Sequence, residues 1–413
     1  MKIFLDTLGC KLNQAETELL SASFSQAGHE IVDSIIDAQL YILNTCTVTQ
    51  TADAKSRQLI RKVHRMNPDA IIVVTGCYAE REAESLRKID GVRVVIGNKN
   101  KLNLLGLLAV TGMMEKGNED HTSEFSSRTR SFVRIQDGCR QFCTYCIMPF
   151  VRKTEISVPP EEILDYVNYR EASGIKEIVL TGTEVGSYRS EDLRLTGLLK
   201  RILEETSVER IRLSSLQPDE ITPDLVNLWK NERLCPHFHI SLQSGSDAVL
   251  KKMNRRYTSD EFLKATSFLI SSIPNVAITT DVIAGFPGEA DEDFEQTCEV
   301  CRKAGFARIH LFPYSKRPGT AAAKVSGQVN DGIITQRSKK LGLIAAECAE
   351  SFRKKFIGSR MVVLWEQKSG RLWSGYTGNY IRVYVNSDND VKNCISTVTL
   401  ASVYKDGMKG KIS

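Results

Sequence analysis

Short apolar runs and amphipathic stretches alternate through the first 112 residues of the chain. The apolar runs have the length of buried strands and lie at 2–9, 40–45, 70–76 and 92–98. The amphipathic stretches have helical spacing and lie at 13–28, 52–66 and 80–89. Gly28 and the Asn67-Pro68 pair stand where two of these helices should end. The pattern predicts an open α/β sheet with parallel strands.

A second, longer alternation begins at Ser131. Its apolar runs predict six strands, at 132–136, 177–182, 210–215, 238–243, 277–286 and 308–314. Helical segments follow the first five, and residues 332–356 form a long closing helix. Six successive β/α units predict a partial or full β/α barrel. The last 58 residues hold four short strand-like pieces separated by Gly, Asn and Asp, which is typical of a small all-β barrel.

We therefore expect three domains, at 1–112, 131–355 and 356–413. Residues 113–130 carry most of the polar stretch GNEDHTSEFSSRTRS, which has no periodicity, and they are predicted to be a linker.

The composition limits where in the cell the chain is expected and which class of partner it can bind. Its longest apolar runs fall far short of a membrane span, and the start, MKIFLDTLG, lacks the apolar region of a signal peptide. We expect a cytoplasmic protein with no membrane partner. The net charge is only +5, but residues 353–413 hold eleven Lys and Arg against four Asp and Glu. This basic tail indicates a polyanionic partner.

Eleven cysteines are many for a reducing compartment, where metal ligation or burial explains them better than disulfides. Cys139, Cys143 and Cys146 are spaced C-x3-C-x2-C after the first strand of the second alternation, on the face where β/α barrels carry their chemistry. A structural zinc site takes four ligands, usually as two short pairs. Cys298 and Cys301 lie on a predicted helix and are interpreted as core residues, so they do not supply a second pair. Three thiolates suit an iron–sulfur cluster with one open iron. Three incidental cysteines are the alternative.

The CRQFCTYC segment resembles the cluster motif of the radical S-adenosylmethionine superfamily. The resemblance implies a [4Fe–4S] cluster on these three cysteines, with S-adenosyl-L-methionine on the open iron as the source of a 5′-deoxyadenosyl radical. It also implies cofactor contacts at later strand ends. The candidates are Gly182, Thr183 and Glu184 for the methionine amino group, Ser241, Gln243 and Ser244 for the ribose, and Ile283 and Gly285 for the adenine. For each loop, the alternative is that Gly and Ser only serve the turn.

Cys10, Cys46 and Cys77 each follow a predicted strand of the first domain and precede a helix. In an open parallel sheet, the carboxyl ends of the strands share one edge, and helix N-termini at that edge favour thiolates. The three cysteines can therefore converge on a second cluster with an open iron. Three unrelated buried cysteines are the alternative.

Five segments together resemble the methylthiotransferases, and the likeness spans essentially the whole chain: TLGCKLNQAETE, NTCTVTQTADAKSRQ, TGCYAE, ISLQSGSDAVLKKMNRRYT and DVIAGFPGEADEDFEQT. The resemblance implies an N-terminal domain with an auxiliary [4Fe–4S] cluster on Cys10, Cys46 and Cys77, a radical S-adenosylmethionine barrel and a C-terminal RNA-binding TRAM barrel. It implies that a C–H bond is replaced by C–SCH3. One S-adenosyl-L-methionine methylates sulfur and another supplies the radical.

Within this family, GCKLNQAETE, NTCTVT and RLSSLQPDEIT are most similar to the branch that modifies N6-threonylcarbamoyladenosine beside the tRNA anticodon, at position 37, on C2 of the base. The alternatives are N6-isopentenyladenosine in tRNA or a ribosomal-protein aspartate. From another class, the alternative is a non-catalytic RNA-binding iron–sulfur protein. The family resemblance further implies a sulfur donor and a reduced electron donor such as flavodoxin or ferredoxin.

Two stretches depart from the family pattern. The segment after Arg152 lacks a glycine and an Arg-Ser-Arg run, and Gln217 stands where a glutamate is expected. The first departure puts in doubt a basic contribution of that loop, and the second removes a carboxylate from the active face.

Aromatic and basic residues interleave in the C-terminal tail. Aromatic rings stack on unpaired bases while Lys and Arg contact phosphates, a pattern that suits a tRNA anticodon stem-loop. The candidate RNA contacts are Lys368, Arg371, Trp373, Tyr376 and Arg382. The alternative is a small barrel that buries its aromatics. The basic helix AKSRQLIRKVHRM, at 54–66, is interpreted as a solvated face.

Overall fold

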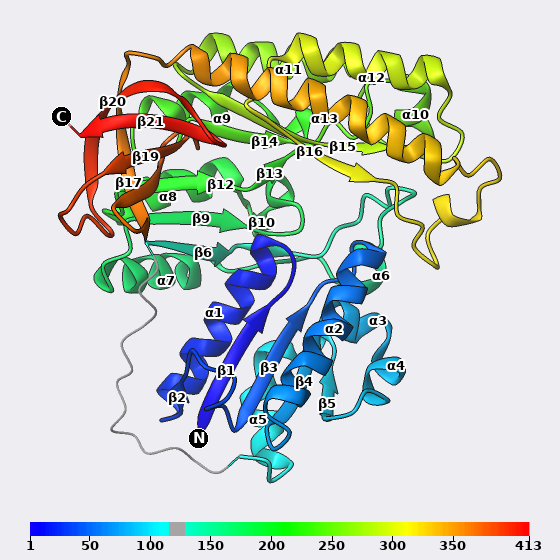
Figure 1. Cartoon of the computed structure of the whole chain (residues 1–413), viewed down its shortest axis with the longest axis vertical. Coiled ribbons are helices and arrows are strands. Elements are labelled where there is room, and N and C mark those ends of the chain that lie inside the picture. Colours follow the sequence, from blue (N-terminus) through cyan, green and yellow to red (C-terminus); the bar gives the residue numbers. More distant parts are fainter. Residues whose placement is uncertain (115–128, 413) are drawn as a thin grey trace.

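The computed structural model describes residues 1–114 and 129–412. Figure 1 shows an N-terminal α/β unit below a larger β/α unit, with a small barrel at one end of the latter. Most of the predicted linker at 113–130 lies outside the described residues. Among the described helices, none has the length and apolar character needed to span a bilayer.

The N-terminal sheet has the strand order β2-β1-β3-β4-β5, and every neighbouring pair is parallel, which confirms the predicted open α/β sheet. Its strands are β1 (Lys2–Thr7), β2 (Glu30–Ile31), β3 (Leu40–Thr45), β4 (Ile71–Gly76) and β5 (Val92–Ile96). Its helices are α1 (Lys11–Gln26), α2 (Gln50–Met66), α3 (Cys77–Arg81), α4 (Ala83–Arg87) and α5 (Leu104–Val110), with a 3-10 turn at Asn98–Asn103.

Helices cover both faces of this sheet. Leu40 and Ile42 of β3 share a core with α1 and α5, while Tyr41 and Leu43 share one with α2 and α4. Because both faces are buried, the central strands read as continuous apolar runs in the sequence. The predicted helix at 80–89 is in fact two short helices that break at Glu82, which has a non-helical φ of -131°.

The middle unit is an open arc of parallel strands, which confirms the predicted partial barrel. Two sheets, ordered β12-β9-β6 and β13-β14-β15-β16, continue into each other through the successive strands β12 and β13. The strands are β6 (Arg130–Arg134), β9 (Glu177–Thr181), β12 (Arg210–Leu213), β13 (Ser215–Leu216), β14 (His237–Ile240), β15 (Ala277–Ala284) and β16 (Arg308–Pro313).

Helices and short pairs surround this arc. The helices are α6 (Met148–Val151), α7 (Pro160–Ala172), α8 (Leu195–Glu205), α9 (Pro223–Val226), α10 (Asp247–Lys252), α11 (Ser259–Ser272), α12 (Asp291–Ala304) and α13 (Asp331–Lys354). Two antiparallel pairs are β7 (Gln136–Asp137) with β8 (Ile156–Ser157), and β10 (Arg189–Ser190) with β11 (Leu193–Arg194). Further 3-10 turns lie at Val185–Ser187, Pro218–Glu220, Asn227–Lys230 and Ala322–Lys324.

The C-terminal unit is a closed barrel with the order β17-β18-β19-β21-β20, as the tail pattern predicted. Its strands are β17 (Arg360–Ser369), β18 (Leu372–Thr377), β19 (Arg382–Asn386), β20 (Ile395–Tyr404) and β21 (Gly407–Ile412). The fifth strand was not predicted, because GMKGKI holds too few apolar residues to stand out. It closes the barrel by pairing with both β19 and β20.

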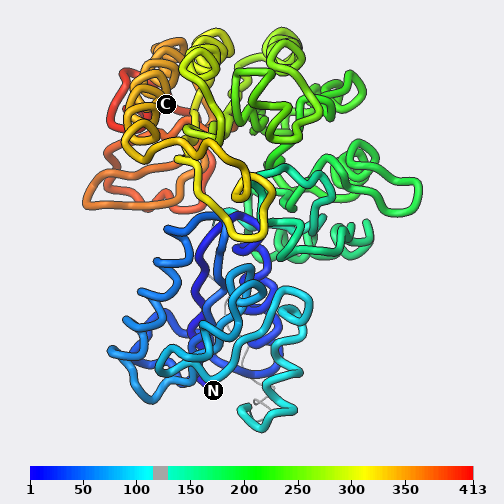
Figure 2. The backbone as a smooth tube through the Cα atoms, turned by 90° about the vertical axis from the view of Figure 1, so that its right-hand side faces the viewer, coloured from blue at the N-terminus to red at the C-terminus, as the bar shows by residue number. Residues whose placement is uncertain are grey.

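The units meet so that their strand ends face one region. Figure 1 shows β1, β3 and β4 pointing toward the β/α unit, and α1 packs against β6 while α3 packs against α6. In Figure 2, α2 (blue) and the C-terminal barrel (orange to red) lie toward the same side, with the yellow segment after β16 between them.

Candidate active site

The three N-terminal cysteines converge at the carboxyl edge of their sheet. Cys10 is the N-cap of α1, Cys46 follows β3, and Cys77 is the first residue of α3. Gly9 and Gly76 precede two of them, with φ of 118° and 100°. A Cβ on Gly9 would lie 2.7 Å from the Cβ of Cys46, and one on Gly76 would lie 2.4 Å from the backbone oxygen just before Cys46. Only glycine lets these loops approach so closely.

The chemistry of this triad fits a cluster. Burial, followed by repulsion from Cys10 and Cys77, raises the pKa of Cys46 to about 12, and burial raises the pKa of Cys10 as well. Neighbouring buried thiols ionise together only when a cation compensates their charge. Among the described residues, no three Cys, His, Asp or Glu side chains could hold a single metal ion. Three separate thiolates are the donor set of an iron–sulfur cluster, in which each binds a different iron.

The second triad lies in the loop between β7 and α6. Backbone N–H groups of Gln141 and Met148 each lie 3.4 Å from a sulfur, of Cys139 and Cys146 respectively. Burial, then repulsion from Cys143, raises the pKa of Cys146 to about 12. N–H donors aimed at buried sulfurs stabilise thiolates, so this donor set also fits an anionic cluster.

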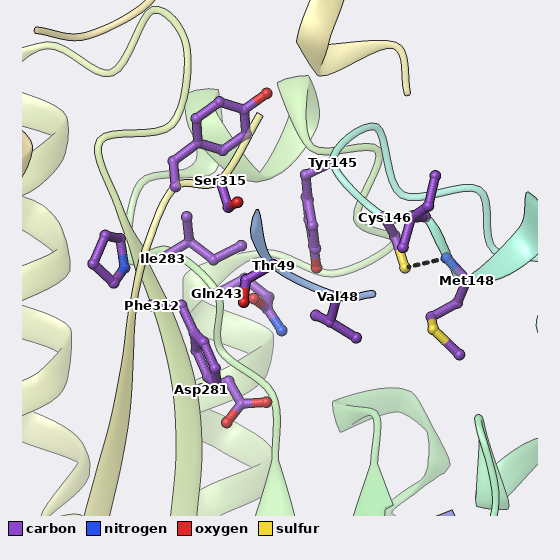
Figure 3. Close-up of a pocket in the computed structure, with 13 residues that line it drawn as sticks. Val48, Thr49, Tyr145, Cys146, Met148, Gln243, Asp281, Ile283, Phe312 and Ser315 are labelled. Atoms are coloured by element: carbon purple, nitrogen blue, oxygen red, sulfur yellow. Dashed lines mark hydrogen bonds between the residues drawn. The ribbon is translucent and has the colours of Figure 1, made fainter. Parts of the chain in front are cut away.

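The two triads lie near one cavity, and Cys146 is the cysteine of the two triads that lines it. Repulsion from Cys77 contributes to the raised pKa of Cys146, so these two side chains lie near each other, and Cys77 packs with Ile147 and Val151. The cavity has a volume of about 150 Å³. It is lined by Val48 and Thr49 from the N-terminal unit and by Tyr145, Cys146, Ile147, Met148, Gln243, Asp281, Ile283 and Phe312–Ser315 from the β/α unit (Figure 3).

The structure brings several predicted cofactor residues to this region. The Glu184 carboxylate lies 3.1 Å from the sulfur of Cys139 and accepts a hydrogen bond from the Gln141 side chain. Thr183 donates to Asp137 at 3.3 Å. Gln243 and Ile283 line the cavity, as Figure 3 shows.

Four other predicted cofactor residues are placed differently. Ser244 is fully buried, and its hydroxyl contacts Thr297 at 3.2 Å, so it does not face the cavity. A Cβ on Gly285 would lie 2.4 Å from Ile334 of α13, so the absence of a side chain at this position makes room for the helix. Gly182 likewise makes room for the Gln136 side chain. Ser241 is buried, and its backbone oxygen accepts the Tyr257 hydroxyl.

Sequence reasoning missed Arg255, which lies in the quoted stretch NRRYT. Its Nη1 donates to the sulfur of Cys143 at 3.3 Å, and its Nη2 donates to Gln217. The departure at position 217 thus has a structural meaning. A glutamate there would neutralise the guanidinium, whereas Gln217 leaves its positive charge available beside the cluster loop. Nearby, burial raises the pKa of Glu220 to about 8, and repulsion from Glu184 adds to this effect.

The RNA candidates of the C-terminal barrel divide into exposed and buried side chains. Trp373 is 3% exposed and packs in the barrel core, so it cannot stack on a base. Tyr376 is half-buried beneath Arg130 and Arg382, whose guanidinium carbons lie 5.0 and 6.0 Å from its ring centre. Lys368 and Arg371 are exposed, so their predicted role in phosphate contacts stays a prediction. The unpredicted β21 adds two exposed lysines, Lys409 and Lys411.

A basic groove runs along α2. It is lined mainly by Arg57, Arg61, His64 and Arg65 of α2 and by Lys88 after α4. Within residues 1–114 and 129–412, Arg61 and Arg65 have no ion-pair partner. The cap of α2, Thr49, lines the cavity, so the groove leads away from the cavity rim.

Family models and relatives match this architecture. Residues 2–97 match the uncharacterized protein family UPF0004, and residues 133–301 match the radical SAM superfamily. Among solved structures, the radical S-adenosylmethionine methyltransferase TsrM from Kitasatospora setae matches with a TM-score of 0.56 and 15% identity, over 78% of this chain and 75% of that chain. This likeness shows the shared fold.

Curated relatives extend over nearly the whole chain. The threonylcarbamoyladenosine tRNA methylthiotransferase MtaB of Bacillus subtilis is 36% identical, over 97% of this chain and 93% of its own. MtaB of Aquifex aeolicus is 36% identical, over 93% and 96%. The tRNA-2-methylthio-N(6)-dimethylallyladenosine synthase of Endomicrobium trichonymphae is 32% identical, over 93% of both. The chain belongs to the radical S-adenosylmethionine methylthiotransferase family.

Proposed function

We propose that this enzyme methylthiolates N6-threonylcarbamoyladenosine at position 37 of tRNA, at C2 of the base. The observation that supports the proposal is the pair of cysteine triads on adjoining units, with Cys77 near Cys146 and Cys146 at the cavity. The near full-length similarity to MtaB proteins favours this nucleoside over the isopentenyl one.

The two triads take different roles in the proposal. Cys139, Cys143 and Cys146 hold the [4Fe–4S] cluster that binds S-adenosyl-L-methionine, and Cys10, Cys46 and Cys77 hold the auxiliary [4Fe–4S] cluster. When bound, these groups supply the electron that cleaves S-adenosyl-L-methionine and an open iron for the sulfur to be transferred.

Residues of the chain orient the cofactor and protect the reaction. Glu184 is placed to accept hydrogen bonds from the methionine ammonium, and Arg255 to pair with the methionine carboxylate. The mostly apolar lining, including Val48, Ile283 and Phe312, excludes water from the region where a carbon radical would form.

Two basic surfaces are suited to the tRNA phosphates. The first is the exposed face of the C-terminal barrel, with Lys368, Arg371 and the lysines of β21, and the second is the α2 groove. The barrel and helix α2, which carry these surfaces, lie toward the same side of the molecule in Figure 2. The proposal places residues 1–112, 131–355 and 356–413 as the three functional domains. It also requires a cytoplasmic setting, a reduced electron donor such as flavodoxin or ferredoxin, and a sulfur donor.

The test combines iron analysis with nucleoside mass spectrometry. The anaerobically reconstituted chain should bind about eight irons, and alanine replacement of either whole triad should leave about four. Deletion of the gene should remove the methylthio group from threonylcarbamoyladenosine in cellular tRNA, and restoration should return it. A change only in the isopentenyl nucleoside, or only in a ribosomal protein, would assign the enzyme to another branch. Cofactor binding without S-adenosyl-L-methionine cleavage would favour a non-catalytic RNA-binding protein.

A further inference from the structure

The segment Met148–Arg152 lies between the two cysteine triads. It begins two residues after Cys146, yet its helix α6 packs against α3, which begins at Cys77. Asn98 strengthens this contact, because its Nδ2 donates to the Val151 carbonyl at 2.8 Å and lies 3.5 Å from the sulfur of Cys77. The loop that carries one triad is therefore held against the other.

Arg152 ends this segment and is buried completely. Its Nη1 donates to Glu16 Oε1 at 2.8 Å and to Asp137 Oδ1 at 2.7 Å. Its Nη2 donates to Glu16 Oε2 and to Asn13 Oδ1, both at 2.9 Å. One guanidinium thus connects the α6 segment, helix α1 and strand β7. We call Arg152, Glu16, Asn13 and Asp137 the Arg152 bridge.

The bridge contacts lie next to cluster ligands. Asn13 Oδ1 is 3.8 Å from the sulfur of Cys10, and its amide nitrogen donates to the carbonyls of Leu8 and Thr45, at 2.9 and 3.0 Å. These two carbonyls lie in the loops that lead to Cys10 and to Cys46. On the other side, Asp137 accepts the backbone N–H of Gly138 at 2.7 Å, immediately before Cys139.

Burying these charged groups costs desolvation free energy, which apolar residues of the same volume would not cost. A buried ion pair is often no more stabilising than apolar residues of the same volume. Its fork-shaped hydrogen bonds, however, fix the relative orientation of three elements, as a flexible apolar contact cannot. Two reacting centres on separate domains require such a device, because a misplacement of about 1 Å costs roughly 100-fold in rate.

We propose that Arg152 is a positioning residue, which sets the distance and orientation between the two cysteine triads so that hydrogen abstraction and sulfur transfer reach the same carbon. The proposal rests on the function proposed above. It also explains how the chain keeps a basic residue here without the Arg-Ser-Arg run: Arg152 acts inside the protein, not on RNA.

The test compares Arg152→Lys with a matched control, Lys101→Met. Lysine keeps the charge but cannot hold Glu16, Asp137 and Asn13 in one planar geometry. Lys101 is equally buried and pairs with the same carboxylate, Glu16, at 2.6 Å. Among the described residues, however, its ammonium group does not contact the segments that carry Cys139, Cys143 and Cys146. Both variants remove or alter a cationic partner of Glu16, but only Arg152→Lys changes a residue of the Arg152 bridge.

Three readouts separate positioning from folding. In Arg152→Lys, we expect unchanged iron content, a broader distance distribution between the two reduced clusters in pulsed electron paramagnetic resonance, and about a tenfold lower ratio of methylthiolated tRNA to 5′-deoxyadenosine. In Lys101→Met, the distance distribution and the ratio should match those of the unmodified chain. Equal ratios in Arg152→Lys and the unmodified chain, or equal losses in the two variants, would overturn the proposal.

A fourth readout is independent of the reaction. In iron-free protein, Arg152→Lys should raise amide hydrogen exchange in the loops at both Cys10 and Cys139, while Lys101→Met should leave the Cys139 loop unchanged. If the unmodified chain formed no methylthio product, the proposed function would fail, and this exchange measurement would still decide the bridge. Unchanged exchange in both loops would refute it.

Discussion

At the scale of single residues, the charge beside Cys143 depends on two side chains that lie far apart in the sequence. Arg255 donates to the cysteine sulfur and to Gln217, and a neutral amide at position 217 leaves the guanidinium charge uncompensated. Because the pair is largely buried, this charge is poorly screened and acts strongly on any anion in the site. If Arg255 pairs with the cofactor carboxylate as proposed, we expect position 217 to tune the affinity for the cofactor.

Gln217→Glu should weaken the binding of S-adenosyl-L-methionine to the reconstituted enzyme about tenfold, since an ion pair with Arg255 would compete with the cofactor carboxylate. Equilibrium dialysis with labelled cofactor measures this change. Gln217→Met is the control, because it removes the hydrogen bond without adding charge. An unchanged affinity in Gln217→Glu would show that Arg255 does not face the cofactor.

Glu16 carries a pH-dependent part of the stability. Burial alone would raise its pKa, but Lys101 and Arg152 outweigh that effect and lower the pKa to about 2. A carboxylate with a depressed pKa in the folded state stabilises the fold above its unfolded value near 4.5, and loses this contribution as the pH falls toward 2. The stabilisation is on the order of 3 kcal/mol.

Glu16→Gln should therefore flatten the pH dependence of the unfolding free energy between about pH 5 and pH 2. Urea unfolding followed at several pH values tests this expectation. Glu161→Gln, on an exposed carboxylate that pairs with Arg201, should leave the slope nearly unchanged. Equal slopes in Glu16→Gln and the unmodified chain would contradict the assignment.

At the scale of elements, α2 shows a pattern that costs helix stability. Arg57, Arg61 and Arg65 follow one another at four-residue spacing on one face, and such like-charge pairs each destabilise a helix by roughly 0.2–0.5 kcal/mol. The helix begins at the cavity rim, where the backbone N–H of Gln50 donates to Ser315 at 3.1 Å. We therefore expect the groove to guide RNA phosphates toward the cavity rim.

Replacing both Arg61 and Arg65 by Glu should weaken tRNA binding about tenfold and reduce the slope of log affinity against log salt by about 2. Filter binding at several salt concentrations checks both numbers. Lys303→Glu on α12 is the control, because Lys303 is exposed, outside the groove and paired with Glu299. Unchanged affinity in the double variant would show that the α2 groove does not bind tRNA. The basic residues of α2 would then only form a solvated face, as the sequence predicted.

The elements that the sequence predicted correctly have local signals. Parallel strands of the sheet and the arc are continuous apolar runs, and four of the six cysteines come at or just after a strand end: Cys10, Cys46, Cys77 and Cys139. Three of these four are preceded by a glycine with positive φ, namely Gly9, Gly76 and Gly138. Arg152 and Arg255 lacked such a signal, because their partners Asn13 and Cys143 lie 139 and 112 residues away. The strand β21 was missed because its extended conformation depends on pairing with β19 and β20, and its own residues carry no apolar strand pattern.

At the scale of the whole molecule, the C-terminal barrel is part of the folded body. Arg210 donates to the carbonyls of Tyr376 and Val362, both at 2.9 Å, and Arg212 donates to the carbonyl of Gly378 at 2.7 Å. The guanidinium of Arg212 also lies 4.1 Å from the ring centre of Tyr380. Tyr380 is therefore a residue of the interface between the barrel and the β/α unit.

Arg212→Met should destabilise the whole protein by roughly 3–5 kcal/mol, since the fully buried Glu177 would lose its partner at 2.8 Å and keep only Arg210 at 3.9 Å. Tryptophan fluorescence during thermal unfolding follows this change, because two of the three tryptophans, Trp365 and Trp373, lie in the barrel core. Arg371→Met, on an exposed pair with Asp388, should change the stability by less than about 0.5 kcal/mol. If the C-terminal barrel and the β/α unit unfolded independently, Arg212→Met would leave the unfolding temperature of the barrel unchanged. A common downward shift of both transitions is the expected result, because the buried arginine joins the barrel carbonyls to a carboxylate inside the β/α unit.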